Sequence, residues 1–208
     1  MSVPTTWGYT LTGVDAIPDI LSAQQFSELT ANKFAGDGRI TSLTKAVDAS
    51  IRNACGWHVT PSLACKVSTT FFSYSVTKKP DGFLMQLPAT YVSAVSSVVI
   101  GGTAHDKYVC DANGILRVYG LSWDGLHEYS TIEVSYTAGV PDAMAAGIRE
   151  LVANRITHAL VSPNGVQSET AGGVSITYSA AWTANARATA LTDDSKATLA
   201  PYTLKGVF

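Results

Sequence analysis

The stretch Ile51-Arg52-Asn53-Ala54-Cys55-Gly56-Trp57-His58-Val59-Thr60-Pro61-Ser62 marks the change from helix to strand in this chain. Before it, apolar residues recur every three or four positions over residues 40–51, with charged residues mostly on the other sides, which predicts an amphipathic helix. Helices often end at a glycine, so Gly56 is predicted to end this helix. Thr60-Pro61 then favours an extended exit, because the residue before a proline avoids the helical region.

A shorter helix is predicted upstream of this one. Ser22 and Gln25 have the spacing of a capping box, and Gly36-Asp37-Gly38 would stop the helical pattern that follows them. Residues 1–20 contain Thr, Gly and Pro with scattered aromatic residues and show no period. We therefore expect an extended N-terminal arm followed by two helices.

Residues 63–137 have a different pattern, which is typical of short antiparallel strands. Pro80-Asp81-Gly82 and Asn113-Gly114 are turn sequences between β-rich runs. Residues 131–136 alternate between polar and apolar side chains, as a half-buried strand does. Strands at this regular spacing predict a small antiparallel sandwich or barrel.

The last third of the chain returns to helix. Pro141 suits the first turn of a long helix with a wide apolar face, which Ser162-Pro163-Asn164-Gly165 would end. A strand-like alternation follows Gly172-Gly173, and residues 192–200 favour a short helix with two aspartates in its first turn.

We therefore predict an α+β protein with a helical core of three to four helices and an inserted β sandwich or barrel. The predicted parts are an N-terminal arm at 1–20, a helical core at 21–62 and 138–162, a β insertion at 63–137, and a C-terminal loop, strand and arm at 163–208.

Composition excludes several classes of protein. The 208 residues include 14 Lys+Arg and 16 Asp+Glu, a net charge of -2, and only 14% are charged while 46% are hydrophobic. Intrinsic disorder is unfavourable with so much apolar surface to bury, and the low charge hints that other subunits cover part of the surface. The absence of a Lys/Arg run argues against a protein that binds the phosphate backbone of DNA. No apolar run approaches a membrane span and no signal peptide is recognisable, so we expect a cytoplasmic protein without a membrane.

No catalytic, metal-binding or cofactor-binding residues are predicted. Cys55, His58, Cys65, His105 and Cys110 lack the spacings of a zinc site, and the odd number of cysteines favours reduced thiols. The chain also lacks a Gly-x-Ser-x-Gly elbow, and no serine, histidine and acid form a known catalytic motif. We expect a protein that is not an enzyme, with a small hydrolase as the least favoured alternative.

The opening stretch, residues 51–62, resembles the end of the second helix in head-to-tail adaptor proteins of long-tailed double-stranded DNA bacteriophages, also called head completion or connector proteins. Five further landmarks are similar to that family and follow in the same order: residues 87–88 with 95–98, 113–117, 134–141, 172–178 and 199–204. The resemblance spans about residues 22–206 and draws its specificity from this co-linear order.

The resemblance implies a helical core with a β elaboration that assembles as a ring of twelve under the portal vertex. Such a ring extends the DNA channel and offers a platform to a downstream neck or tail-terminator protein. The protein would be assembled in the host bacterial cytoplasm and reside in the neck of the virion, and genomic DNA would pass through without specific binding. The alternative is a tail-terminator or other ring protein of the neck or tail, which should lack the Cys-Gly-Trp-His helix end joined to this β insertion.

Two sets of site residues follow from this hypothesis. The C-terminal arm would bind the portal by extended backbone or apolar anchors; its predicted portal-binding residues are Leu199, Pro201, Tyr202, Leu204, Val207 and Phe208. The loop at 162–172, with Gln167 and Glu169, is predicted to line the channel. A neutral or negative wall avoids ion pairs that would slow the passage of DNA.

Overall fold

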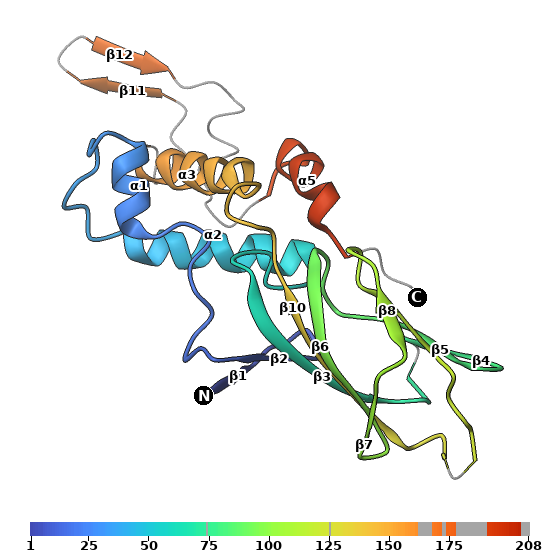
Figure 1. Ribbon diagram of the computed structural model, residues 1–208. Helices are drawn as coiled ribbons and strands as arrows, with labels where there is room; N and C mark the ends of the chain where they lie inside the picture. Colours follow the sequence, from blue (N-terminus) through green and yellow to red (C-terminus); the bar gives the residue numbers. More distant parts are fainter. Residues whose placement is uncertain (74, 125, 162–167, 172–173, 178–190, 205–208) are drawn as a thin grey trace. The chain divides into compact units, whose positions relative to one another are not determined.

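The computed structural model describes residues 1–73, 75–124, 126–161, 168–171, 174–177 and 191–204, and these form an α+β protein as predicted (Figure 1). The helices are α1 (Ala23–Leu29), α2 (Ile40–Cys55), α3 (Ala146–Val161) and α5 (Asp193–Leu199), with a 3-10 turn η1 (Ala200–Tyr202). The strands are β1 (Ser2–Pro4), β2 (Thr10–Thr12), β3 (Leu63–Thr70), β4 (Val76–Lys79), β5 (Gly82–Gln86), β6 (Val92–Ile100), β7 (Thr103–His105), β8 (Tyr108–Cys110), β9 (Ile115–Tyr119), β10 (Thr131–Ala138), β11 (Ser168–Ala171) and β12 (Val174–Thr177).

The chain divides into two compact units. The β unit comprises Met1–Pro18, Cys55–Asp142 and Tyr202–Phe208, and the helical unit comprises Asp19–Ala54 and Ala143–Pro201. The β unit extends beyond the predicted insertion at 63–137, because both chain ends and the segment after α2 belong to it.

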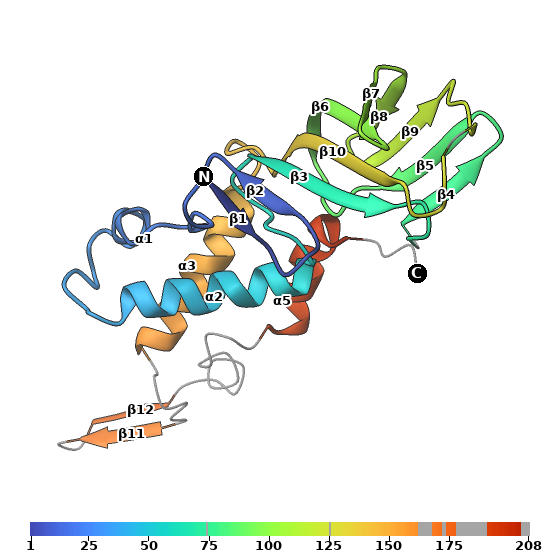
Figure 2. The same ribbon diagram turned by 90° about the horizontal axis from the view of Figure 1, so that it is seen from below.

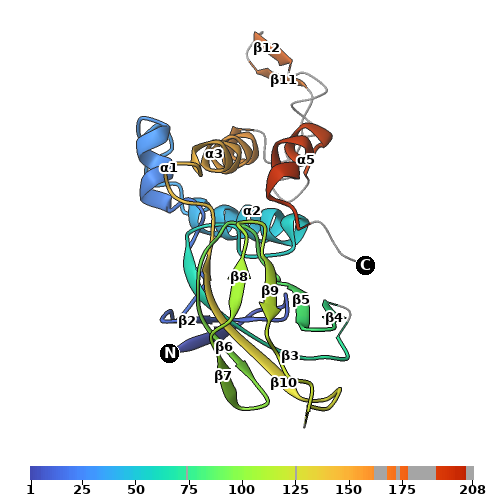
Figure 3. The same cartoon turned by 45° about the vertical axis from the view of Figure 1, so that its right-hand side comes forward.

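Two antiparallel sheets make up the β unit. One has the order β1-β2-β3-β10-β6-β7 and the other the order β4-β5-β9-β8 (Figures 2 and 3). The side chains of Ile132, Val134 and Tyr136 on β10 are almost completely buried, while the residues between them are partly exposed. This confirms the alternation predicted for residues 131–136 and places the core on one side of the six-stranded sheet.

The N-terminal residues form part of this sheet, which differs from the predicted extended arm. β1 and β2 pair as a hairpin, and β2 adds to β3 with Leu11 opposite Cys65. Leu11 is completely buried. Strands of three residues are too short for their alternation to stand out in the sequence, so the hairpin escapes a search for periodicity.

The predicted turns are confirmed where glycine is required. Asn113-Gly114 joins β8 to β9, and Gly114 has a φ of 82°. A Cβ at Gly114 would collide with the carbonyl oxygen of Ala89, so this close approach admits only glycine. Gly56 follows the last residue of α2 with a φ of 80°, which confirms it as the helix end.

The helical unit begins with the predicted capping box. The Ser22 side chain accepts the N–H of Gln25, and the Gln25 side chain accepts the N–H of Ser22. In α5, the predicted aspartates occupy the first turn, and Thr192 is the N-cap. β11 and β12 form an antiparallel pair; a strand was predicted for the second of these segments and a loop for the first.

Helix α2 is buried over a wider face than predicted. Asp48 and Arg52, expected away from the apolar stripe, are only 2% and 7% exposed. Asp48 Oδ2 accepts the backbone N–H of Ile20 at 2.7 Å, and Arg149 on α3 donates to the Ile20 carbonyl at 3.4 Å. Asp48 is buried because its carboxylate binds the backbone that leads into α1.

Helix α3 begins five residues later than Pro141, the predicted start. The backbone N–H of Val140 donates to Val59 at 2.7 Å, and the hydroxyl of Thr60 donates to the Val140 carbonyl at 3.2 Å. Val140 is completely buried. These bonds keep the chain extended past the end of β10, so the helix starts only at Ala146.

Candidate interaction surfaces

The segment from Cys55 to His58 is a buried junction within the β unit. Trp57 is completely buried, and its Nε1 donates a hydrogen bond of 2.6 Å to the carbonyl oxygen of Tyr202. The backbone N–H of Leu204 donates to the carbonyl of Cys55 at 2.9 Å. Residues 202–204 therefore satisfy a carbonyl that the end of α2 leaves without a helical partner.

His58 is a buried histidine, and each of its two ring nitrogens has a hydrogen-bond partner. Its Nε2 lies 2.9 Å from the carbonyl oxygen of Ala138 and its Nδ1 lies 2.8 Å from the hydroxyl of Tyr9. Because a carbonyl oxygen can only accept, Nε2 carries a proton, and in the neutral ring Nδ1 then accepts from the hydroxyl of Tyr9. The Tyr9 hydroxyl also accepts the backbone N–H of His58 at 3.0 Å. The ring thus joins the N-terminal hairpin to the end of β10.

Most of the predicted portal-binding residues that the structure describes contact the chain itself. Leu199 is buried in the helical unit, at 1% exposure. The ring of Tyr202 stacks on Tyr91 with 5.8 Å between centroids, Leu204 is partly buried, and Pro201 is exposed. The remaining two predicted residues, Val207 and Phe208, lie outside the described residues.

The predicted channel-lining residues are described only in part. Gln167 lies outside the described residues. Glu169 lies on β11, where its backbone is paired with Ile176 of β12.

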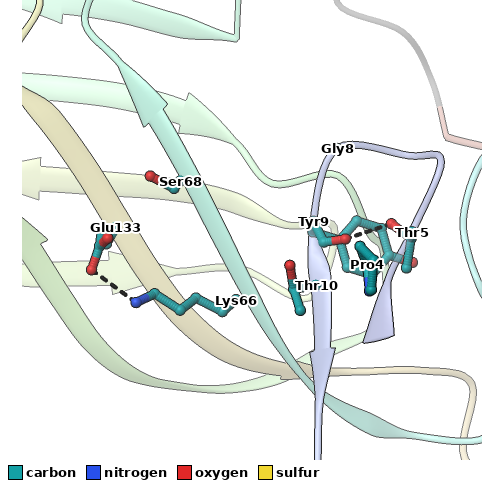
Figure 4. Close-up of a pocket in the computed structure, with 8 residues that line it drawn as sticks. All are labelled: Pro4, Thr5, Gly8, Tyr9, Thr10, Lys66, Ser68 and Glu133. Atoms are coloured by element: carbon teal, nitrogen blue, oxygen red, sulfur yellow. Dashed lines mark hydrogen bonds and ion pairs between the residues drawn. The ribbon is translucent and has the colours of Figure 1, made fainter. Parts of the chain in front are cut away.

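A polar hollow of about 420 Å³ opens on the outward face of the six-stranded sheet (Figure 4). Lys66 and Glu133 form an ion pair of 2.9 Å at its edge, and both side chains are about two-fifths exposed. The remaining lining residues come from the N-terminal hairpin and β3: Pro4, Thr5, Gly8, Tyr9, Thr10 and Ser68. The hollow can accept a polar or charged side chain through hydroxyl and carboxylate oxygens.

The outward face of the four-stranded sheet carries apolar side chains instead. Val109 on β8 is 56% exposed, and Ile115 and Tyr119 on β9 are 44% and 38% exposed. Leu84 on β5 and Arg117 on β9 adjoin these three residues on the same face, and we call the five residues together the β9 patch. Exposed apolar groups that adjoin one another on a sheet are typical of an interaction surface.

Phe72 and Tyr129 form a second exposed apolar site. They are 68% and 75% exposed, and their rings stack at 6.1 Å between centroids. Large aromatic side chains of this kind are enriched in protein interfaces.

The three cysteines are free thiols. Burial raises the pKa of Cys55 to about 11, of Cys65 to about 12 and of Cys110 to about 11. These thiols are therefore protonated near neutral pH and poor nucleophiles. Among the residues that the structure describes, no three His, Cys, Asp or Glu side chains lie close enough to hold a metal ion. No helix in the same part of the chain has the length and hydropathy to cross a membrane.

Comparison with known proteins gives one structural likeness that we report here. No protein-family model and no curated protein matches the chain. A solved chain described as "Neck of empty GTA particle computed with C6 symmetry" matches 95% of this chain and 97% of its own length. The two chains are 16% identical and superpose with a TM-score of 0.49.

Proposed function

We propose that this chain is a structural neck protein of a bacteriophage, one that forms a ring of twelve between the portal and the tail components. The observation that carries the proposal is the co-linear order of short segments that resemble the head-to-tail adaptor family. Three of them, residues 51–62, 113–117 and 134–141, contain the end of α2, the turn before β9 and the passage out of β10. These three segments lie where one helix or strand of the fold passes into the next segment of the chain.

The role proposed is structural and not catalytic. The ring would complete the head, extend the DNA channel in the virion neck and present a platform to a downstream neck or tail-terminator protein. Genomic DNA would pass through without specific binding, and assembly would take place in the host bacterial cytoplasm. The low charge of the chain and the exposed apolar residues of the β9 patch support a protein that buries surface against other subunits.

The portal contact is assigned to the C-terminal end. Tyr202 and Leu204 are already engaged with the β unit, which leaves Val207 and Phe208 as the apolar anchors, together with the exposed Pro201. In many interfaces a few buried anchor residues contribute most of the binding energy. Gln167 and Glu169 are assigned to the channel wall, where neutral or negative side chains would avoid ion pairs with DNA.

Imaging of purified neck complexes by negative stain, with native mass measurement in the presence and absence of portal, tests the proposal. We expect a rotationally symmetric annulus of twelve copies that forms only with the portal. A chain that stays solitary in mature virions, or is missing from them, rules the proposal out. Turnover of generic ester, peptide or phosphoester substrates by the purified protein would favour a hydrolase instead.

A further inference from the structure

The two sheets of the β unit present chemically different outward faces. On the six-stranded sheet, the outward residues of β3 and β10 include Lys66, Ser68, Glu133 and Ser135, as expected for a face in contact with water. On the four-stranded sheet, the outward residues of β8 and β9, with Leu84 of β5, form the β9 patch, and the polar residues Thr77, Lys79 and Gln86 lie on the same face. One sheet thus follows the usual polar pattern and the other departs from it, although both belong to the same unit.

The β9 patch is continuous across three strands. Leu84 of β5 lies opposite Arg117 of β9, which in turn lies opposite Val109 of β8. Leu116 and Val118 on either side of Arg117 are buried, so Arg117 points outward between Ile115 and Tyr119. The patch therefore consists of apolar side chains around one central cation.

Arg117 limits what can cover this patch. Among the described residues, no carboxylate forms an ion pair with its guanidinium group. Two copies that met patch to patch about a two-fold axis would bring two guanidinium groups together, which is unfavourable. A covering surface that differs from the patch and carries a carboxylate avoids this repulsion and pairs the arginine.

The outward face of the six-stranded sheet carries such a carboxylate. Glu133 binds Lys66 through Oε2, and its other oxygen, Oε1, accepts no hydrogen bond from any described residue. The hollow beside it, about 420 Å³, has room for a protruding arginine side chain (Figure 4). An arginine bound there would share the carboxylate with Lys66 as a three-membered ion network.

These two faces point away from each other. The sheets pack through their buried sides, where Phe71 after β3 contacts Phe83 of β5 at 5.3 Å between ring centroids. A contact between the outward face of one sheet and the outward face of the other must therefore join two molecules. Such a head-to-tail contact repeats from copy to copy and closes into a ring when the rotation allows it.

We propose that each copy packs its β9 patch against the outward face of the six-stranded sheet in the next copy, with Arg117 entering the hollow beside Glu133. The inference rests on the ring proposed above and names the surfaces that hold it together. The apolar side chains around Arg117 exclude water from the ion network, which strengthens it.

Site-specific photo-cross-linking in neck complexes assembled with portal tests the contact. We replace Ile115 by the photo-reactive amino acid p-benzoylphenylalanine and assemble a mixture of isotopically light and heavy copies. The expected product joins position 115 of one copy to residues 64–70 or 131–137 of another. The same replacement at Met144, which is 54% exposed and lies outside the patch, is the matched control and should not give this product.

A double-mutant cycle tests the ion pair itself. Arg117→Met and Glu133→Gln should each weaken the association between subunits by roughly thirtyfold or more, as removal of one partner from a desolvated pair does. The double variant should be no weaker than either single variant, because the interaction is already lost. Both side chains are exposed in the single chain, so neither change should alter its thermal unfolding.

The outcomes separate this inference from the neck role. A ring in which position 115 is cross-linked only to other segments, to the portal or to another neck protein overturns the inference and leaves the neck role intact. Additive effects of Arg117→Met and Glu133→Gln overturn it as well. If no ring forms in mature particles, both the inference and the neck role are wrong.

Discussion

The indole Nε1 of Trp57 donates a hydrogen bond of 2.6 Å to the carbonyl oxygen of Tyr202, a residue 145 positions later in the chain. Two further contacts act beside it: Leu204 donates to the carbonyl of Cys55, and the ring of Tyr202 stacks on Tyr91. The last described residues of the chain are therefore part of the β unit, and Leu204 satisfies the backbone carbonyl of Cys55, the last residue of α2.

Replacing Trp57 by phenylalanine should destabilise the β unit by about 1–3 kcal/mol, because it removes the hydrogen bond to Tyr202 and leaves a void in a fully buried site. Urea unfolding measures the loss of stability. Hydrogen exchange should show faster exchange at the Leu204 amide, since the segment that holds it is released. Trp7→Phe is the control, because Trp7 is partly exposed and should change neither quantity. An unchanged Leu204 amide in the Trp57 variant contradicts the prediction.

Tyr9→Phe should cost about 1–3 kcal/mol of stability, although it removes only one oxygen atom. The hydroxyl of Tyr9 donates to Nδ1 of His58 and accepts its backbone N–H, so the change leaves two buried polar groups without this partner. Thermal unfolding of the two proteins gives the difference. Tyr129→Phe is the matched control, since Tyr129 is 75% exposed and its loss of a hydroxyl should be nearly neutral. Equal effects of the two substitutions would argue against the His58 junction.

Local chemistry made much of the fold predictable. A capping box at Ser22, a helix end at Gly56 and a hairpin turn at Asn113-Gly114 each depend on one to four neighbouring residues, and the structure confirms all three. The burial of Asp48 and the late start of α3 were not predictable in this way. Both depend on hydrogen bonds between residues far apart in the sequence, as Ile20 with Asp48 shows.

The candidate surfaces were less predictable for the same reason. Residues 115–119 read Ile-Leu-Arg-Val-Tyr, so they are apolar at every position except Arg117, and the sequence does not say which set faces the core. The register of β9 against β5 and β8 decides it, and that register is a property of the folded unit. Likewise, no feature of the neighbouring sequence shows that Leu199 is buried in the chain and is not an exposed anchor for the portal.

Deleting residues 205–208 should abolish attachment to the portal while leaving the fold of the β unit intact. This change removes Val207 and Phe208 but keeps the Tyr202 carbonyl and the Leu204 amide that bind Trp57 and Cys55. Deleting residues 202–208 should also abolish attachment, but it should lower the unfolding temperature as well. Co-purification with portal and thermal unfolding separate the two effects. Normal attachment of the shorter deletion would remove the C-terminal end from the portal contact.

The contribution of Asp48 to the stability of the helical unit should increase as the pH falls from 7 to 5, against the usual trend for carboxylates. Burial raises the pKa of Asp48 to about 6 from its ordinary value of 3.8, and the N–H of Ile20 and the charge of Arg52 only partly offset this rise. The folded chain therefore binds more protons than the unfolded chain between these two values. The stabilisation is complete below pH 4 and is lost as the pH rises through 6, with a range of at most about 3 kcal/mol.

Urea unfolding followed by the helical circular dichroism signal at several pH values measures this slope. Asp48→Asn should remove it, because an amide does not titrate and its oxygen can still accept the N–H of Ile20. Asp37→Asn is the control: hydrogen bonds from Arg39 lower the pKa of Asp37 to about 2, so this carboxylate stays ionised throughout the window and contributes no slope. Equal pH slopes in the wild type and in Asp48→Asn would place the titrating group elsewhere.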